Sequence, residues 1–153
     1  MTELEKCELA KSKGYTYCPV SGELKGVYGK VITNKDRYGY IECRVYCATK
    51  PFFILGHRLA WYLHYGHLPV NSIDHIDGVR SNNKIENLRD VTAQQNQWNH
   101  TKAKGYYWNK PANKFCAQIR INGKTKHLGV FQTEQKARNA YLKAKEIYHV
   151  INA

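Results

Sequence analysis

The segment Ile73–Gly78 constrains the fold of this chain more than any other, because it sets an acidic and a basic side chain next to each other in an apolar run. Its last two residues, Asp-Gly, form a turn signal that ends the run. We therefore predict a strand that delivers Asp74 and His75, with Ile73 and Ile76 anchoring the pair in the core. Because successive side chains of a strand alternate, Asp74 and His75 should face opposite sides.

The residues on either side predict a strand, a loop, a return strand and a helix. Asn-rich residues 81–83 predict the loop, and Leu88–Val91 predicts the return strand. Thr92 is a good N-cap for a helix over residues 93–99. Upstream, residues 57–65 carry apolar side chains at helical spacing, and the glycine that follows is a C-cap signal.

These pieces stand in an order that is typical of one nuclease family. Residues 57–100 resemble an HNH endonuclease domain of the phage type. The resemblance rests on His-Arg-Leu-Ala-Trp, Asp-His, Glu-Asn-Leu-Arg, Gln-Asn and Asn-His, which follow one another in this order. In the phage type the third residue of the His-Asn-His motif is Asn and not His. The resemblance implies the His-Me finger, or ββα-metal, fold. It also implies that Asn87 orients His75 and braces the loop, a role that spacing alone does not distinguish from Asn83.

The chemistry of phosphodiester hydrolysis gives the other residues their roles. The reaction needs an in-line water, charge neutralisation at the phosphate and stabilisation of the departing 3′ oxygen. His75 can accept the proton of the water near neutral pH. A twist or bulge at the strand end would let Asp74 meet Asn96 around one hard cation. One carboxylate and one amide oxygen suit Mg²⁺, with Mn²⁺ as the alternative.

Three nearby residues have less definite roles. His100 follows Asn96 by four residues and is a candidate third ligand, with a phosphate contact or a solvated helix end as the alternatives. Arg89 is a candidate for contact with the scissile-strand phosphate, and an ordinary surface arginine is the alternative. We assign no catalytic role to His57, since a histidine at a helix start is usually structural.

Charge indicates a polyanionic partner. The chain has 24 Lys and Arg against 12 Asp and Glu, a net charge of +12 and a pI near 9.5. Residues 101–153 hold 11 of the basic residues and only two glutamates. Such a balance favours a nucleic-acid partner, here double-stranded DNA, over a merely basic soluble protein.

The last segment carries a second resemblance. Gly-Tyr-Tyr-Trp at 105–108, residues 114–120, His-Leu-Gly-Val-Phe at 127–131 and Thr133-Glu134 are similar to the APETALA-type DNA-binding domain of plant ethylene-response factors. That resemblance implies a three-stranded sheet packed on one helix, over residues 101–153. Phe115 and His127 replace tryptophans that are usual in the plant form.

The residues themselves indicate the same architecture. Asn122-Gly123 between two strand-like runs is a strong hairpin signal, and Thr133 should cap a helix with an apolar stripe. In this register Ala117 faces Leu128, and Phe115, Ala117 and Ile119 share the face opposite the polar one. The predicted DNA contacts of the segment lie on its polar face or come from the resemblance: Tyr107, Asn109, Gln118, Arg120, Thr125 and His127.

Residues 1–56 predict a small, β-rich N-terminal segment. Tyr38–Tyr46 alternates apolar and polar residues, the period of a half-buried strand. Its lysines and arginines would contact DNA phosphates, or form the solvent face of a small sheet. The resemblance favours contact with DNA.

The five cysteines form no CxxC pair, so we expect reduced thiols and no structural zinc. Residues 1–6 lack the apolar core of a signal peptide, and no run approaches membrane-spanning length. We expect a cytoplasmic protein, in the host cell if a phage encodes it.

The sequence thus predicts an α+β protein with three segments: residues 1–56, a nuclease domain at 57–100 and a DNA reader at 101–153. Its function would be metal-dependent, site-specific DNA cleavage, most like that of a phage free-standing homing endonuclease. A non-catalytic DNA-binding regulator and an HNH restriction enzyme are the alternatives. With one Asp-His-Asn set and no heptad run, we expect a monomer that nicks one strand, while dimerisation on DNA would give double-strand breaks.

Overall fold

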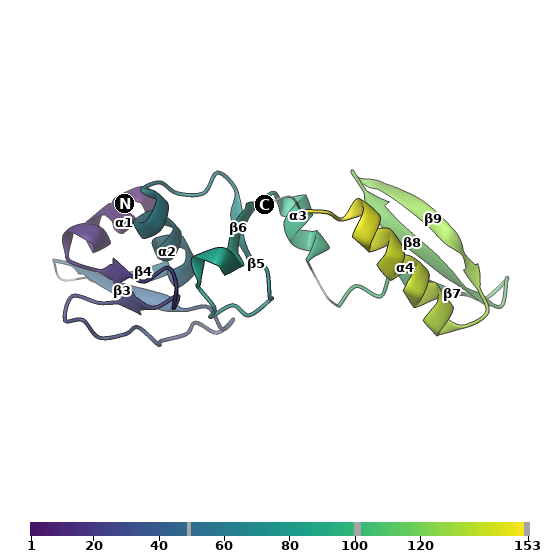
Figure 1. The fold of residues 1–153 in the computed structure, drawn as a ribbon, viewed down its shortest axis with the longest axis horizontal. Coiled ribbons are helices and arrows are strands. Elements are labelled where there is room, and N and C mark those ends of the chain that lie inside the picture. Colours follow the sequence, from purple (N-terminus) through teal and green to yellow (C-terminus); the bar gives the residue numbers. More distant parts are fainter. Residues whose placement is uncertain (49, 100–101, 152–153) are drawn as a thin grey trace. The chain divides into compact units, whose positions relative to one another are not determined.

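The computed structural model describes residues 1–48, 50–99 and 102–151, and the chain divides into two compact units. The first unit is Met1–Thr92 and the second is Ala93–Ala153 (Figure 1). Both units combine helices with small antiparallel sheets, so the predicted mixed α and β architecture is confirmed at this level. The predicted division into three functional segments remains a prediction.

The first unit pairs its described strands into three two-stranded sheets. Strands β1 and β2, β3 and β4, and β5 and β6 are the antiparallel pairs. Its elements are α1 (Glu3–Ser12), β1 (Thr16–Tyr17), β2 (Leu24–Lys25), β3 (Glu42–Cys47), β4 (Lys50–Leu55), α2 (Gly56–Tyr65), β5 (Ser72–His75), the 3-10 turn η1 (Ile85–Asn87) and β6 (Leu88–Val91). The N-terminal β structure is therefore two separate strand pairs and not one sheet.

Strand β3 begins four residues later than the sequence predicted. The Asp36 side chain accepts hydrogen bonds from the backbone N–H groups of Tyr38 and Tyr40, at 2.8 and 2.9 Å. These bonds close a turn around Gly39, whose φ of 89° lies in the left-handed region. The alternating run from Tyr38 therefore starts as a turn and becomes a strand at Glu42.

The helix α1 was not predicted, although its start carries a sequence signal. The Thr2 side chain accepts from the Glu5 N–H, and the Glu5 carboxylate accepts from the Thr2 N–H. This reciprocal capping box, Thr-x-x-Glu, satisfies two N–H groups at the helix start that have no partner within the helix. The helix then buries Cys7 and Ala10 against the core of the first unit.

One hydrophobic core holds the first unit together, and β5 delivers the Asp-His pair from it. Ile73 and Leu88, on the paired strands β5 and β6, belong to this core with Leu59 and Trp61 of α2. Ile73 thus anchors the pair as predicted. The prediction for Ile76 was wrong, because Ile76 follows the last residue of β5 and turns outward, with 44% of its surface exposed.

The second unit contains the predicted three-stranded sheet packed on a helix. The described strands order as β7-β8-β9, and α4 packs Tyr141 and Ala144 against Ile119 of β8. Ala137 of the same helix is also buried. The Thr133 side chain accepts from the Lys136 N–H and caps α4, as predicted. The elements are α3 (Ala93–Trp98), β7 (Tyr106–Asn109), β8 (Lys114–Ile121), β9 (Lys124–Phe131) and α4 (Glu134–Tyr148).

The hairpin between β8 and β9 turns at Asn122-Gly123, as predicted. Both residues have positive φ, 48° and 77°, the conformation that a tight two-residue hairpin turn needs. One part of the predicted register was wrong: Ala117 pairs with Gly129 and not with Leu128. A β-bulge next to Ala117 causes the difference, because it inserts one extra residue into β9.

None of the helices in the described part of the chain has both the length and the apolar character needed to cross a lipid bilayer.

Candidate active site and nucleic-acid interface

His75 ends β5 as a buried side chain with a fixed hydrogen bond. Only 4% of its surface is exposed, and its Nε2 lies 3.2 Å from Oδ1 of Asn83. Because an amide oxygen can only accept, this bond places the ring proton on Nε2. The lone pair of the neutral ring is then on Nδ1, which is the atom that a general base would use.

Asn83 is itself held rigidly, in a socket that two glycines leave open. It is 2% exposed, and its backbone oxygen accepts from the Tyr17 hydroxyl at 2.7 Å. A Cβ on Gly56 would lie 2.9 Å from the Asn83 side-chain nitrogen, and one on Gly22 would lie 2.8 Å from the Asn83 carbonyl carbon. Only glycine leaves room at these positions, so segments far apart in the sequence together fix the amide that contacts His75.

Asn87, at the end of η1, contacts the loop that follows His75. Its Oδ1 accepts from the backbone N–H of Asp77 at 3.0 Å, and its Nδ2 donates to Asp77 Oδ1 and to the Asn82 carbonyl. These bonds brace the loop between β5 and β6. Asn83 thus contacts the imidazole and Asn87 holds the loop, and the catalytic role of Asn87 remains a prediction.

Asp74 is buried on the neighbouring position of β5 and is paired with an arginine. It is 8% exposed, and its Oδ2 accepts from Arg89 Nε at 3.0 Å and from Arg89 Nη2 at 2.7 Å. The two residues lie opposite each other in the β5–β6 register. The Arg89 guanidinium thus neutralises the Asp74 carboxylate, and its contact with a phosphate remains a prediction.

Three rings pack together beside the general-base candidate. The ring of Tyr40 lies 5.9 Å from that of His75 and 5.1 Å from that of His57, and the two imidazoles are 5.3 Å apart at nearly a right angle. His57 is 6% exposed, and its Nδ1 has no hydrogen-bond partner among the described residues. Burial lowers the pKa of His57 to about 3, helped by the neighbouring His75, so this ring is neutral at physiological pH.

The pKa of His75 is also lowered, mainly by burial. The Asn83 hydrogen bond and the carboxylates of Asp77 and Asp74 act in the opposite direction, and Arg80 adds to the lowering. A histidine whose pKa lies below its usual value is neutral at pH 7 and can accept a proton without first losing one.

The donor set for a metal ion is one of hard oxygen atoms. Asp74 supplies a carboxylate and Asn96 an amide oxygen, which suit a divalent cation that keeps several waters. In the described residues no group of three His, Cys, Asp or Glu could hold a metal ion. Asp74 belongs to the first unit and Asn96, on α3, to the second, so their pairing stays a prediction. The candidate ligand His100 lies outside the described residues.

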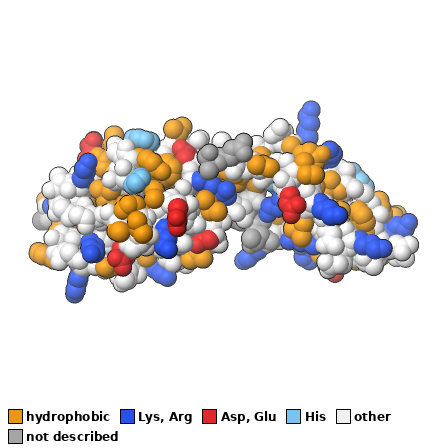
Figure 2. Space-filling view, viewed as in Figure 1, with side chains coloured by type: hydrophobic (Ala, Val, Ile, Leu, Met, Phe, Trp, Pro, Cys, Tyr) orange, Lys and Arg blue, Asp and Glu red, His pale blue; other side chains and the backbone are white. Residues whose placement is uncertain are grey.

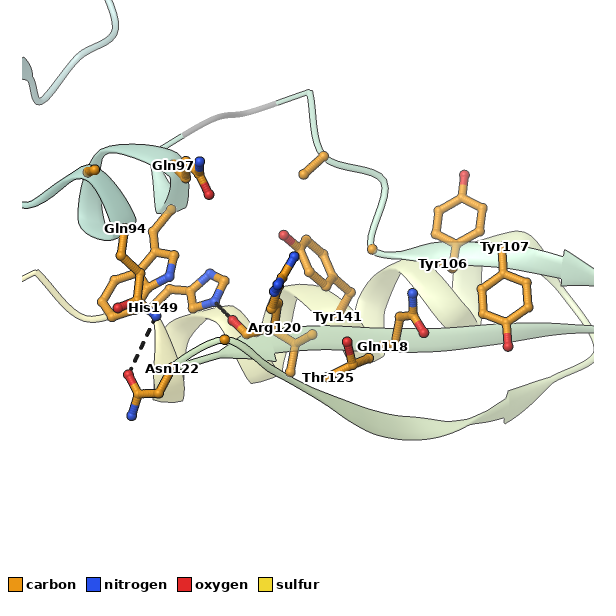
Figure 3. Close-up of a pocket in the computed structure, with 16 residues that line it drawn as sticks. Gln94, Gln97, Tyr106, Tyr107, Gln118, Arg120, Asn122, Thr125, Tyr141 and His149 are labelled. Atoms are coloured by element: carbon orange, nitrogen blue, oxygen red, sulfur yellow. Dashed lines mark hydrogen bonds between the residues drawn. The ribbon is translucent and has the colours of Figure 1, made fainter.

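The predicted DNA contacts of the second unit share one face of its sheet. Gln118 pairs with His127 and Arg120 with Thr125, on the face opposite the Ile119 side chain that packs on α4. Tyr107 and Asn109 occupy alternate positions of β7, and Tyr107 leaves the strand opposite to Tyr106 (Figure 3). The phenol of Tyr106 hydrogen-bonds Glu134 at the start of α4.

A cavity of about 850 Å³ lies where β8 extends beyond Tyr106, the first residue of β7 (Figure 3). Four of the predicted DNA contacts line it: Tyr107, Gln118, Arg120 and Thr125. Sequence reasoning missed its other wall, which comes from α3 and the end of α4. There the Trp98 ring stacks on His149 at 4.8 Å, and His149 Nε2 donates to the Arg120 carbonyl at 2.9 Å.

Basic side chains are not confined to this sheet. On the face shown in Figure 2, Lys and Arg side chains are scattered over each unit and do not gather in a single patch. In the first unit several arginines lie over aromatic rings, such as Arg44 over Tyr46 and Phe53. Such positions combine positive charge with flat apolar surface, as many nucleic-acid-binding surfaces do.

One family model matches the segment that was predicted to be the nuclease. Residues 55–98 match the family model described as HNH endonuclease. The matched segment includes α2, the β5–β6 hairpin with Asp74 and His75, and α3 with Asn96. This match supports the assignment of the chain as a hydrolase that cleaves DNA.

One solved structure is similar over most of the chain. It is described as "DNA binding and cleavage by the HNH homing endonuclease I-HmuI", with 24% sequence identity and a TM-score of 0.48. The similarity covers 74% of this chain and 70% of that chain. No curated protein matches the chain.

Proposed function

We propose that this HNH enzyme is a metal-dependent, site-directed endonuclease that nicks double-stranded DNA, as a phage-encoded homing endonuclease does. One observation carries the proposal: the hydrogen bond from His75 Nε2 to the buried Asn83 amide, beside the carboxylate of Asp74. A surface histidine in a turn would not be held in one tautomer in this way. The bond prepares Nδ1 to accept the proton of an attacking water.

The remaining residues of the site bind and orient. Asp74 and Asn96 would hold a divalent cation, Mg²⁺ or Mn²⁺. When bound, such a cation neutralises charge on the phosphate and stabilises the departing 3′ oxygen. Arg89 keeps the Asp74 carboxylate in one orientation, since two of its nitrogens donate to the same oxygen. Asn87 keeps the loop after His75 in place through Asp77.

The second unit supports recognition of a particular site. Its face of Gln118, Arg120, Thr125 and His127 presents donors and acceptors suited to base edges in the major groove. The excess of lysine and arginine in residues 101–153 would attract the phosphate backbone. We propose a monomer that binds an asymmetric site, because one chain carries one Asp-His pair of this kind and one reading face.

A plasmid assay tests the catalytic assignment. Supercoiled DNA from phage and host libraries, incubated with the protein and Mg²⁺, should go first to open circle, and the mapped nicks give the site. His75→Ala should abolish nicking and leave DNA affinity nearly unchanged, since a neutral base contributes to the transition state and not to phosphate attraction. His64→Ala, which removes an exposed histidine of α2, is the matched control. Undiminished nicking by His75→Ala would refute the assignment.

The asparagines offer a finer test. Asn83→Ala should lower the rate about 10- to 100-fold, because the imidazole loses the partner that fixes its tautomer and orientation. Asn82→Ala removes a nearby amide that contacts Asp77 and not His75, and it should have a smaller effect. Equal losses from the two variants would show that the Asn83 contact has no special role.

A further inference from the structure

An arginine that the sequence did not single out lies beside the candidate general base. Arg80 stands in the loop between β5 and β6, and its side chain is exposed. Its Nη1 donates to the Tyr38 carbonyl at 2.8 Å, and its guanidinium carbon lies 5.1 Å from the centre of the Tyr40 ring. One hydrogen bond and one stacking contact thus hold an exposed cation in place.

Tyr40 joins this cation to His75. The same ring that lies under Arg80 is 5.9 Å from the His75 imidazole. Arg80 and His75 therefore contact the same aromatic ring, which places the guanidinium near the candidate general base.

Hydrogen bonds to Asp77 close the loop that carries Arg80. The Asp77 carboxylate accepts from the Val79 N–H at 2.8 Å, from Asn82 Nδ2 at 2.7 Å and from Asn87 Nδ2 at 3.0 Å. These three bonds tie both ends of the loop to the buried Asn87 of η1. A guanidinium fixed in this way needs little reorganisation to bind an anion, and preorganised charge is the most effective kind in catalysis.

Other arginines of the first unit are engaged differently. Arg89, the earlier candidate, uses Nε and Nη2 to neutralise Asp74, and its side chain is 15% exposed. Arg44 lies over Tyr46 and Phe53 on β3, a strand that does not supply the Asp-His pair. Arg80 combines exposure, a fixed position and closeness to His75.

We propose that Arg80 binds the scissile-strand phosphate and stabilises the charge that develops on it during hydrolysis. The proposal rests on the proposed function of His75 as general base. A guanidinium has five N–H donors in a fixed fork, and the Tyr38 carbonyl takes only one of them. The others suit two phosphate oxygens at once, a geometry that lysine does not reproduce.

The first test is kinetic. Single-turnover nicking of supercoiled plasmid is measured at saturating protein with Mg²⁺, so that DNA affinity does not limit the rate. Arg80→Gln should lower the rate about 100-fold, in the range found when one transition-state donor is removed. Arg80→Lys should recover only part of it. His64→Gln changes an exposed residue of α2 that has no place in the proposed site, and its rate should stay within about twofold of the wild-type value.

The second test needs no cleavage. In metal-free buffer, a DNA duplex is titrated into ¹⁵N-arginine-labelled protein, and the Nε–Hε signal of Arg80 should shift much more than that of Arg58, which is paired with Glu3. The assay therefore separates two failures. If the wild-type protein nicks no DNA, the proposed function fails while the Arg80 signal still reports phosphate binding. A wild-type nicking rate in Arg80→Gln, or an Arg80 signal unmoved by bound DNA, would overturn the proposal.

Discussion

The buried His57 should make the first unit lose stability as the pH falls below 6.5. Its pKa is about 3 in the folded protein, against 6.5 for an accessible histidine, because burial disfavours the charged ring. Below pH 6.5 the unfolded chain binds a proton at this position that the folded chain does not. Neutral His57 therefore leaves the free energy of unfolding undiminished above pH 6.5, and its protonation in the unfolded chain lowers that free energy progressively toward pH 3.

The size of the effect follows from the linkage between proton binding and folding. Between pH 7 and pH 5 one such histidine costs about 2 kcal/mol of unfolding free energy. His57→Phe keeps a ring of similar size in the cluster with Tyr40 and removes the titration, and His57→Gln is a second variant in case the phenyl ring does not pack. Between pH 7 and pH 5 the free energy of unfolding should fall by about 2 kcal/mol less in both variants than in the parent protein.

Urea unfolding followed by the fluorescence of Trp61 measures this difference. Trp61 is 9% exposed in the core of the first unit, and a background with Trp98→Phe and Trp108→Phe removes the other two tryptophans. His64→Gln replaces an exposed histidine of the same helix, and its free energy of unfolding should fall between pH 7 and pH 5 as that of the parent does. If the parent and both His57 variants lose stability in parallel between pH 7 and pH 5, the argument from burial is refuted.

Three further predictions concern the scaffold. Gly105→Ala should lower the free energy of unfolding of the second unit by more than about 3 kcal/mol, because the new Cβ would lie 1.9 Å from the Tyr141 ring. Gly123→Ala, at a similar φ but with open space around it, should lower it by about 1 kcal/mol. The β8 amide signals in NMR-monitored urea unfolding give both values. Arg89→Gln should destabilise the first unit by about 3 kcal/mol by leaving the buried Asp74 without its partner, and adding Asp74→Asn should restore part of that loss in the Trp61 assay. Cys18 should react with iodoacetamide well before Cys43 in mass spectrometry, since hydrogen bonds from Ser21 lower the pKa of the exposed Cys18 thiol and burial raises that of Cys43 to about 12; faster labelling of Cys43 would contradict the described core.

Local signals predicted the second unit well. The Asn-Gly turn, the Thr133 cap and the apolar stripe of α4 are each encoded within a few residues, and each appears in the structure. The bulge beside Ala117 was not predicted, because an extra residue in one strand depends on how the two strands twist against each other.

The first unit was predicted less completely. The Asp-His pair, the return strand and the helix α2 with its Gly66 cap were all visible in the sequence. The helix α1 was missed although Thr2 and Glu5 form a capping box, a signal that could have been read. Ile76 was assigned to the core by its apolar character alone, and the position of the strand end turned it to solvent.

The sequence by itself determined which groups the chain offers: an Asp-His pair on a strand, asparagines downstream, an excess of cations and a hairpin with a polar face. Only the tertiary structure decided how those groups are paired. It gave the amide beside His75 to Asn83 and not to Asn87, and it engaged Arg89 with Asp74 while leaving Arg80 exposed. The physical reason is that such contacts join side chains of different strands, turns and loops, and the spacing of residues within one element carries no record of them.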